Sequence, residues 1–219
     1  MRSVIIANGV LNHISDARKS LRPDDLLIAA DGGMRHCHAL GVMPHVVIGD
    51  LDSLDPAEAD TLKAVDVEVI QHPTRKDQTD LELALVLAAK RGATEIIVLG
   101  ALGARWDMTM ANILLPAASA LAGITIRLID GQQEIMLLRG GEEISFHGKR
   151  NDILSLIPLG QDAIGVTLRG LEYPMENGVL RFGDTRGISN ALTKETAIVY
   201  LKQGLLLCTH IRMHDDRYP

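Results

Sequence analysis

PHVVIGDLDSL, residues 44–54, is the stretch that most clearly indicates the fold, because an apolar run in it ends directly in two carboxylates. Val46–Ile48 has the β-branched composition of a buried strand, and Gly49 permits a sharp turn after it. Asp50 and Asp52 follow where that strand stops. In an open α/β sheet, ligands bind outside the carboxyl ends of the strands. Carboxylates there are hard oxygen ligands that suit Mg²⁺ carrying a polyphosphate, so the stretch indicates a metal and phosphate site.

Around this strand, short apolar runs alternate with helical patterns from residue 1 to about residue 137. Such alternation predicts right-handed βαβ units and a mostly parallel, doubly wound sheet covered by helices. The expected strands are Val4–Ala7, Leu26–Ala30, Val46–Ile48, Val67–Ile70, Ile96–Leu99 and Ile124–Ile129. The expected helices lie around Ser15–Leu21, Gly33–Leu40, Pro56–Val65, Thr79–Arg91 and Met108–Leu121.

After Gly140 and Gly141 the pattern changes to short apolar runs separated by turn residues, with no long helix between them. This spacing predicts an antiparallel β-sandwich or barrel. We therefore expect an α/β domain at 1–137, followed by a β-rich domain at 138–219. The strands expected in the second domain are Glu143–Phe146, Ile153–Ile157, Ile164–Leu168, Val179–Phe182, Ala197–Leu201 and Leu205–Thr209.

Composition narrows the classes of partner. The chain has 219 residues, 47% of them hydrophobic, which allows a sizeable core. A net charge of −6 and only 3% aromatic residues argue against binding to nucleic acid. The two cysteines, Cys37 and Cys208, form no CxxC pair and predict neither a disulfide scaffold nor a zinc site. No apolar segment approaches the roughly 20 residues that span a membrane, and the N-terminus resembles a first strand more than a signal peptide. We expect no membrane association and a cytoplasmic location.

A second acidic motif, RKDQTD at residues 75–80, opens the fourth expected helix. Asp77 and Asp80 are three residues apart, which fits an N-terminal capping arrangement. They also form a mixed-charge cluster with Lys76 at a helix N-terminus, where cations and free amides can hold phosphates while an acid holds metal. Both interpretations stay open for this motif. Capping could also explain one acid of GDLDS, but not two on one side.

The segment AADGGMRH at residues 29–36 again ends an expected strand with an acid, Asp31. Gly32 and Gly33 would let the backbone approach a ligand and leave N–H groups free at the next helix start. An ordinary strand–turn–helix junction would use the same residues.

A glycine-rich loop, GALGARWDMTMAN at residues 100–112, follows another expected strand. Gly103 makes the loop adaptable, Arg105 offers a planar fork for phosphate, and Asp107 heads the next helix. The loop is not a P-loop, because it lacks the GK[ST] ending. A surface arginine followed by an aspartate cap is the alternative.

The segment FGDTRGISNAL at residues 182–192 is unusually polar for the strand-rich half. Ser189 and Asn190 could form hydrogen bonds to a heterocycle, although a turn between strands would use the same residue types. The eight histidines of the chain show no spacing typical of metal ligands.

The ordered set ADGG, GDLDS, KDQTD, GARWD and GISN resembles the thiamine pyrophosphokinase (thiamine diphosphokinase) family over nearly the whole chain, including the stretch GLEYPMENGVLRFGDTRGISN. The resemblance implies transfer of a diphosphate group from ATP to the thiamine hydroxyl, giving thiamine diphosphate and AMP. It also implies Mg²⁺ and a homodimer, with substrate sites between the catalytic domain of one subunit and the thiamine-binding β-domain of the other.

The resemblance also assigns roles to individual residues. Asp50, Asp52 and Asp80 would hold Mg²⁺, Lys76 and Arg105 would stabilise the charge that spreads during transfer, and Asp77 or Asp80 would accept the hydroxyl proton. Nucleotide-binding positions would be Asp31, Gly32, Gly33, Lys76, Gly103, Arg105 and Asp107. Contacts to thiamine would come from Thr79, Ser189 and Asn190.

Two positions depart from the family pattern. The family commonly has a second glycine where Ala104 stands, and a histidine where Met108 stands. These departures keep open a diphosphokinase for another hydroxymethyl heterocycle, such as a pterin. A nucleotide-binding module without turnover is a further alternative, but such a module would be expected to lose the metal-binding acids, and all of them are present.

Overall fold

The computed structural model describes residues 1–50, 67–103 and 105–213 of the chain. It contains two compact units, Met1–Gly131 and Gln132–Pro219. The division therefore falls a few residues before the boundary at 137/138 that the change of sequence pattern suggests. The residues between the two positions are mostly a strand of the second unit, Gln133–Arg139.

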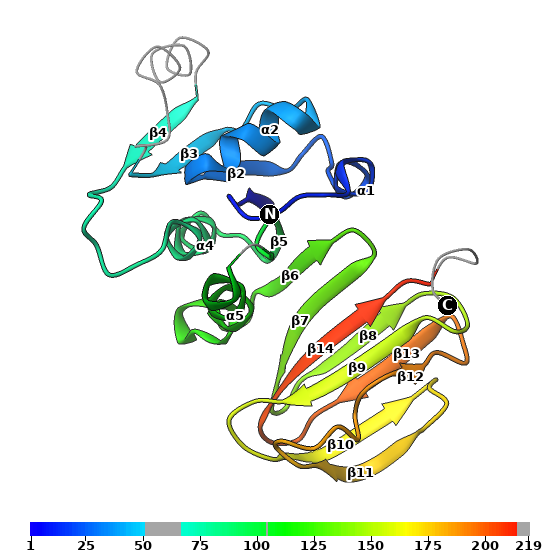
Figure 1. Cartoon of the computed structure of the whole chain (residues 1–219). Coiled ribbons are helices and arrows are strands. Elements are labelled where there is room, and N and C mark those ends of the chain that lie inside the picture. Colours follow the sequence, from blue (N-terminus) through cyan, green and yellow to red (C-terminus); the bar gives the residue numbers. More distant parts are fainter. Residues whose placement is uncertain (51–66, 104, 214–219) are drawn as a thin grey trace. The chain divides into compact units, whose positions relative to one another are not determined.

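The first unit is built on a parallel sheet with the strand order β6-β5-β1-β2-β3-β4 (Figure 1). The inner strands are almost fully buried, as expected where helices cover both faces of a sheet. The chain runs outward from β1 to β4 and then returns to place β5 on the other side of β1. The order of strands thus reverses between β1 and β5. The strands are β1 (Arg2–Ile6), β2 (Leu26–Ala30), β3 (Val46–Gly49), β4 (Glu68–Gln71), β5 (Glu95–Leu99) and β6 (Thr125–Asp130).

The α/β prediction for this unit is confirmed, and its six expected strands match these to within about two residues at each end. The expected helix at Pro56–Val65 lies outside the described residues. The helix expected to reach Leu121 ends earlier, at Leu114, and continues as two 3₁₀ turns. Pro116 explains this difference, because it has no N–H to donate and its ring clashes inside a helix. The helical elements are α1 (Ile14–Lys19), η1 (Asp31–Gly33), α2 (Met34–Leu40), α4 (Asp80–Lys90), α5 (Trp106–Leu114), η2 (Leu115–Ala117) and η3 (Ser119–Leu121).

The helices of the described ranges are short: α4, with 11 residues, is too short to cross a bilayer, and none of the others combines the length and apolar character that crossing requires.

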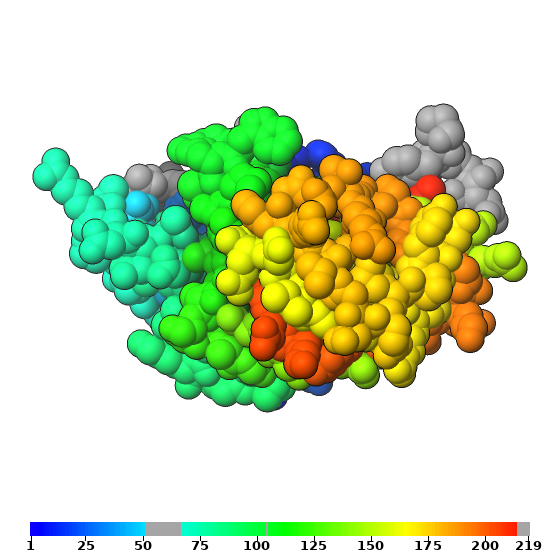
Figure 2. Space-filling model, turned by 90° about the horizontal axis from the view of Figure 1, so that it is seen from below, coloured from blue at the N-terminus to red at the C-terminus, as the bar shows by residue number. Residues whose placement is uncertain are grey.

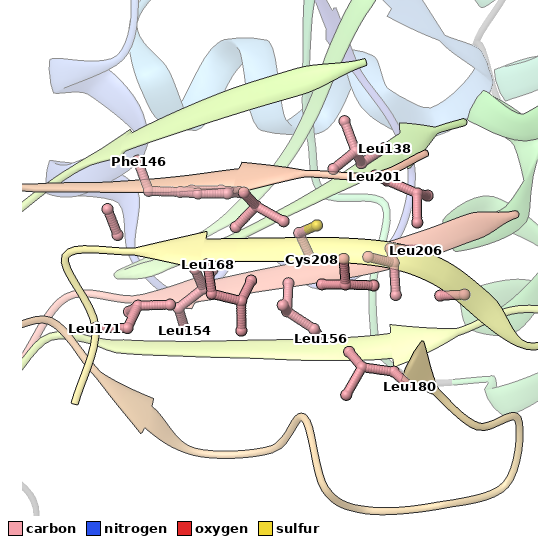
Figure 3. Close-up of a cluster of buried hydrophobic side chains, with 14 of the residues drawn as sticks. Leu138, Phe146, Leu154, Leu156, Leu168, Leu171, Leu180, Leu201, Leu206 and Cys208 are labelled. Carbon is pink, nitrogen blue, oxygen red and sulfur yellow. The ribbon is translucent and has the colours of Figure 1, made fainter. Parts of the chain in front are cut away.

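The second unit packs two antiparallel sheets face to face, with strand orders β12-β9-β14-β7 and β11-β10-β13-β8. Alternate side chains point between the sheets, among them Leu154 and Leu156 on β9 and Leu206 and Cys208 on β14 (Figure 3). The predicted antiparallel β domain is therefore confirmed. Its strands are β7 (Gln133–Arg139), β8 (Glu143–His147), β9 (Ile153–Pro158), β10 (Ala163–Arg169), β11 (Met175–Leu180), β12 (Asn190–Ala191), β13 (Thr196–Tyr200) and β14 (Leu205–Ile211).

The strand expected at Val179–Phe182 begins and ends earlier, as β11. The polar segment after it is a connection that leads to the two-residue strand β12. Figure 2 shows β10, β11 and this connection, coloured yellow to orange, forming the visible face of the second unit. Phe182 in the connection is exposed.

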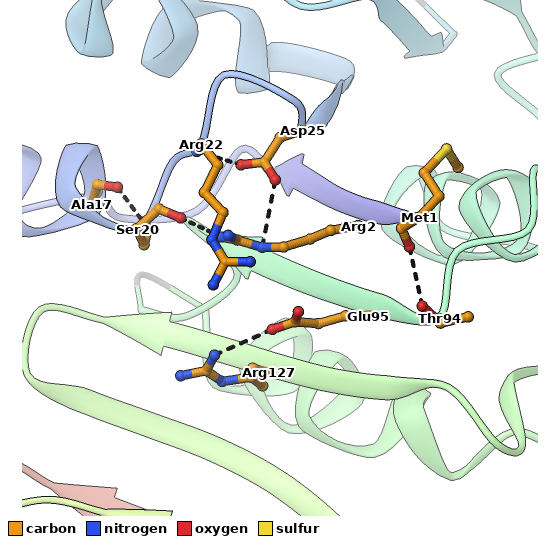
Figure 4. Close-up of polar contacts among 9 residues, drawn as sticks. All are labelled: Met1, Arg2, Ala17, Ser20, Arg22, Asp25, Thr94, Glu95 and Arg127. Carbon is orange, nitrogen blue, oxygen red and sulfur yellow. Dashed lines mark hydrogen bonds and ion pairs between the residues drawn. The ribbon is translucent and has the colours of Figure 1, made fainter.

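The amino ends of the strands in the first unit carry ion pairs (Figure 4). The Nε of Arg2 lies 3.5 Å from Oδ1 of the buried Asp25, which also accepts a 2.6 Å hydrogen bond from the N–H of Arg22. Across β5 and β6, Glu95 pairs with Arg127 at 3.3 Å. These contacts hold the edge of the sheet opposite the one where ligands bind in such folds.

Candidate functional site

A cavity of about 370 Å³ lies at the carboxyl ends of β1, β2 and β5. It therefore coincides with the reversal of strand order between β1 and β5, which is the usual ligand position in open α/β sheets. Its walls come from the segments after these three strands, the start of α4 and the inner face of α5. The lining residues are Ala7, Asn8, Gly9, Ala30, Asp31, Thr79, Asp80, Leu81, Ala101, Gly103, Arg105, Met108 and Asn112.

Backbone hydrogen bonds join the segments after β1 and β5 into one floor. The N–H of Ala7 donates to Leu99 at 2.8 Å, and the N–H of Gly9 donates to Gly100 at 2.6 Å. One residue further, the N–H of Val10 donates to the carbonyl of Leu102 at 2.9 Å. The floor thus continues the pairing of the two strands beyond their ends.

The cavity brings together five of the site residues predicted from sequence: Asp31, Thr79, Asp80, Gly103 and Arg105. They come from three different segments: the end of β2, the start of α4 and the loop before α5. Lys76, Asp77 and Asp107 do not line the cavity themselves, although Lys76 and Asp107 pair with residues that do.

Asp31 stands at the end of β2 in a left-handed conformation, with φ of 49°. Its Oδ2 accepts a 3.2 Å hydrogen bond from Nδ2 of Asn8, which follows β1. A side chain at Gly32 would collide with Asn8, and one at Gly33 would collide with the carbonyl of Ile6. The two glycines therefore serve the close packing of the β1 and β2 ends, while Asp31 faces the cavity.

Asp50 directly follows β3 and does not line the cavity. A Cβ at Gly49 would stand 3.1 Å from the Cα of Asp31, so the ends of β2 and β3 are in close contact. The carbonyl of Asp50 accepts a 3.3 Å hydrogen bond from the side chain of Gln71. Asp52, the other acid of this motif, lies outside the described residues.

At the start of α4 the structure separates the two interpretations of RKDQTD. Thr79 is the capping residue, because its Oγ1 accepts a 3.2 Å hydrogen bond from the N–H of Glu82. Asp80 points into the cavity and pairs with Lys76, with Nζ and Oδ1 2.9 Å apart and both side chains mostly buried. Asp77 is exposed. Thr79 therefore caps the helix, while its neighbour Asp80 faces the cavity.

The loop before α5 presents a cation to the cavity. Arg105 and Asp107 form a two-point contact, with Nε–Oδ1 3.1 Å and Nη2–Oδ2 2.5 Å. The hydrogen bond from Arg105, together with the N–H of Met108, lowers the pKa of Asp107, and the same hydrogen bond raises the pKa of Arg105. Both groups are fully solvated, so the contact orients the guanidinium more than it stabilises the fold. Ala104 lies outside the described residues.

Met108 lines the cavity, which places a thioether where the family commonly has an imidazole. A thioether is a weak acceptor and carries no charge at any pH. The departure seen in the sequence therefore falls at the site itself.

Two lining residues with polar side chains, Asn8 and Asn112, were missed in the sequence. Asn8 directly follows an apolar run, just as Asp31 and Asp50 do, and that position was the available signal. Asn112 is 7% exposed, on the inner face of α5, and its Nδ2 donates a 2.7 Å hydrogen bond to the carbonyl of Ala101. A single asparagine within an apolar helix gave no comparable signal.

In the second unit, Ser189 is exposed in a left-handed conformation, with φ of 59°, and its N–H donates to Oγ of Ser155 at 3.0 Å. Asn190 is buried, and its amide clamps the backbone of Tyr173: Oδ1 accepts from the N–H at 3.0 Å and Nδ2 donates to the carbonyl at 2.9 Å. Asn190 thus fixes the exposed Tyr173 beside the Ser189 turn. The contacts of Ser189 and Asn190 to thiamine stay predictions.

Within residues 1–50, 67–103 and 105–213, no group of three or more His, Cys, Asp or Glu is arranged to hold a metal ion. Two carboxylates, Asp31 and Asp80, nevertheless line the same cavity, and Asp50 directly follows Gly49, whose backbone lies against Asp31. A set of carboxylate oxygens is the donor type that Mg²⁺ takes when it also binds phosphate.

The family models and the relatives that match this chain all carry the same description, over most of its length. Residues 17–128 match the model described as thiamin pyrophosphokinase, catalytic domain, and residues 143–206 match that for the vitamin B1 binding domain. Thiamine pyrophosphokinase from Bacillus subtilis (strain 168) is 31% identical over 203 residues, which cover 93% of this chain and 95% of that protein. Thiamine pyrophosphokinase 1 from Oryza sativa subsp. japonica is 28% identical over 178 residues, covering 77% and 67%.

Solved structures give the same result. The crystal structure of the Bacillus subtilis thiamine pyrophosphokinase superposes with a TM-score of 0.86 at 31% identity, covering 98% of this chain and 100% of that one. The thiamin pyrophosphokinase from Geobacillus thermodenitrificans superposes with a TM-score of 0.85 at 27% identity, covering 98% and 99%. The chain therefore belongs to the thiamin pyrophosphokinase family.

Proposed function

We propose that this protein transfers the diphosphate group of ATP to the hydroxyl of thiamine, giving thiamine diphosphate and AMP, and that it does so in the cytoplasm. One observation carries the proposal: Asp31, Asp80 and Arg105 line a single cavity at the reversal of strand order in a chain of this family. The family models and the relatives name thiamine, which favours thiamine over a pterin as the acceptor.

The reaction needs positioning and charge neutralisation more than covalent help from the protein. The thiamine oxygen forms a bond to the β-phosphorus while the bond from that phosphorus to the oxygen bridging to the α-phosphorus breaks. AMP leaves with the bridging oxygen, and the hydroxyl proton passes to a carboxylate. Asp80 lines the cavity and Asp77 does not, which favours Asp80 for this step.

The cations of the site would steady the phosphates. Asp107 engages Nε and Nη2 of Arg105, which leaves the N–H groups of Nη1 and the second N–H of Nη2 for phosphate oxygens in the cavity. Lys76 is held beside Asp80 and can move its ammonium group toward a phosphate when metal binds that carboxylate. Both side chains would oppose the negative charge that spreads in the transition state.

We further propose that Asp50, Asp52 and Asp80 hold Mg²⁺, with the carboxylate of Asp31 beside them. The ion would neutralise charge on the phosphate oxygens. Chelation with EDTA should abolish turnover and readdition of Mg²⁺ should restore it. A lower affinity for ATP in titration calorimetry without Mg²⁺ would give an independent measurement of the same site.

The direct test is incubation with ATP, Mg²⁺ and thiamine, followed by chromatographic identification of both products. We expect AMP and thiamine diphosphate in equal amounts. Formation of ADP, or nucleotide turnover that does not depend on thiamine, would contradict the proposal. A pterin carrying a hydroxymethyl group serves as the alternative acceptor and should remain unmodified.

A homodimer with shared sites is the second part of the proposal. Trp106, Met110 and Leu114 are exposed and spaced four residues apart, so they form one apolar stripe on α5. In the second unit, Tyr173 and Phe182 are also exposed, and Asn190 holds Tyr173 beside the Ser189 turn. Exposed apolar surfaces of this kind mark contact sites between proteins. A two-fold dimer would cover the stripe on α5 and the exposed aromatic residues of the second unit in both subunits.

Mixed dimers test the shared site. Asp80→Asn alters the first unit and Ser189→Arg alters the exposed turn of the second, and each variant alone should be inactive. After the two are unfolded and refolded together, heterodimers should contain one intact site each, and about a quarter of the wild-type activity should return. Each variant refolded alone is the control. A mixture that stays inactive, although light scattering shows dimers, would exclude sites shared between subunits.

A further inference from the structure

Asn112 is the cavity residue with an unused hydrogen-bonding group. Its side chain is 7% exposed, and the Nδ2 donates to the carbonyl of Ala101 at 2.7 Å. If the amide were flipped, its oxygen would face the carbonyl oxygen of Ala101. The contact therefore shows that Nδ2 faces Ala101 and that Oδ1 points the other way. The Oδ1 atom is buried and has no hydrogen-bond partner among the described residues. Because buried acceptors are nearly always paired, this one calls for a donor that the described residues do not supply.

The surroundings of Asn112 suit a flat ring. The lining residues Ala7, Ala30, Leu81 and Ala101 are, like Asn112, buried, and all four are apolar. The lining residues Asn8, Gly103 and Arg105 are exposed, and two of them are polar. Ligand pockets commonly combine an apolar wall with a few placed polar groups that fix orientation. The buried part of the lining thus fits a heteroaromatic base, and the exposed part fits charged phosphates.

We propose that Oδ1 of Asn112 accepts a hydrogen bond from the exocyclic amino group of the adenine of ATP and thereby selects adenine over guanine. This inference rests on the use of ATP proposed above. Among the two substrates, ATP is the better candidate, because the cavity is formed by residues within and just before the segment that matches the catalytic domain, whereas the vitamin B1 binding model matches residues 143–206.

The selection follows from the chemistry of the two bases. Adenine carries an amino group at position 6, which can donate to Oδ1. Guanine carries a carbonyl oxygen at that position, which would face Oδ1 as a second acceptor and leave both unpaired. Sites built to pair with a substrate N–H reject analogues that lack it far more strongly than apolar pockets reject a missing methylene.

Titration calorimetry with Mg²⁺ and without thiamine tests the contact. The probes are ATP, GTP and purine riboside triphosphate, which has hydrogen in place of the amino group. The wild-type protein should bind the purine analogue about tenfold more weakly than ATP, and GTP more weakly still. Asn112→Ala should bind ATP about tenfold more weakly than the wild type does, while its affinity for the purine analogue changes less than about twofold. Asn112→Leu, which retains the side-chain volume, should behave in the same way.

The outcomes separate a direct contact from a structural role. A structural role of Asn112 would weaken ATP and the purine analogue equally, and would also change the KM for thiamine; either result overturns the proposal. The wild-type comparison needs no variant and so holds even if the substitutions impair folding. Equal binding of ATP and the purine analogue, with thiamine-dependent AMP formation intact, would refute the contact alone. Absence of binding by any nucleotide would refute the proposed function as well.

Discussion

Asp80 is the residue at which the acidic motif and the cavity meet. It lines the cavity and pairs with Lys76, while the neighbouring Thr79 provides the helix cap. We expect Asp80→Asn to reduce kcat at least about 100-fold, because it removes a charge next to the transferring phosphates. The fold should remain, since asparagine is tolerated in the first turn of a helix. Steady-state kinetics and thermal unfolding measure the two effects.

Glu82→Gln is the matched control for this substitution, because it removes the same charge from the same turn of α4 at a residue that does not line the cavity. Its kcat should stay within about threefold of the wild-type value. Near-normal turnover of Asp80→Asn, or equal losses in both variants, would remove Asp80 from the site and attribute the effect to the charge of the helix terminus.

The residues of the site could be predicted from sequence when they were charged and stood at a strand end or a helix start. Asp31 and Asp80 met both conditions, and each lines the cavity. Asn112 met neither, because a neutral side chain within a helix gives no pattern until the fold shows which face it lies on. For Gly32 and Gly33, the structure shows that their small size serves the packing of two strand ends, and their contact with a ligand stays a prediction.

At the scale of single elements, α4 depends on its cap. Thr79→Ala should lower the free energy of unfolding by about 1 kcal/mol, because the N–H of Glu82 loses its acceptor. Thr79→Ser keeps a hydroxyl in the same place and should lose much less. Urea denaturation followed by circular dichroism measures both. Equal losses in the two variants would show that the methyl group of Thr79, and not its hydroxyl, provides the stability.

The elements themselves were predictable to different degrees. Buried strands such as β1, β2, β3 and β5 have continuous apolar runs, which place their ends well. The end of α5 was predicted too late, because its apolar pattern continues past Pro116 as two 3₁₀ turns. The short β12 could not be predicted, since two residues carry no periodicity and pair only because β9 lies beside them.

At the scale of the whole molecule, each unit buries one cysteine in its own core. Burial raises the pKa of Cys37 from 9.0 to about 12 and the pKa of Cys208 to about 12. A thiol whose pKa is raised by folding stabilises the folded state fully below pH 9, and this contribution is lost as the pH rises toward 12. Neither thiol should therefore react with an aromatic disulfide reagent at pH 8 in the native protein.

In denaturant both thiols should react within minutes, and this provides the positive control. Rapid reaction of one thiol in the native protein would show that the unit containing it opens locally, and Cys37→Ser and Cys208→Ser would identify which unit that is. The two cores would then differ in stability, which a single unfolding transition would not reveal.

The hydrogen bonds that join the segments after β1 and β5 have a consequence for the energetics of recognition. Gly100, Ala101 and Leu102 each have their carbonyl engaged by another part of the first unit, so the floor of the cavity is held in one shape by its own hydrogen bonds. The free energy of ligand binding is therefore not reduced by a cost for ordering the backbone of that floor. At this part of the site, association should therefore be governed by diffusion and by the release of water, without a slow rearrangement that would lower the rate constant for binding.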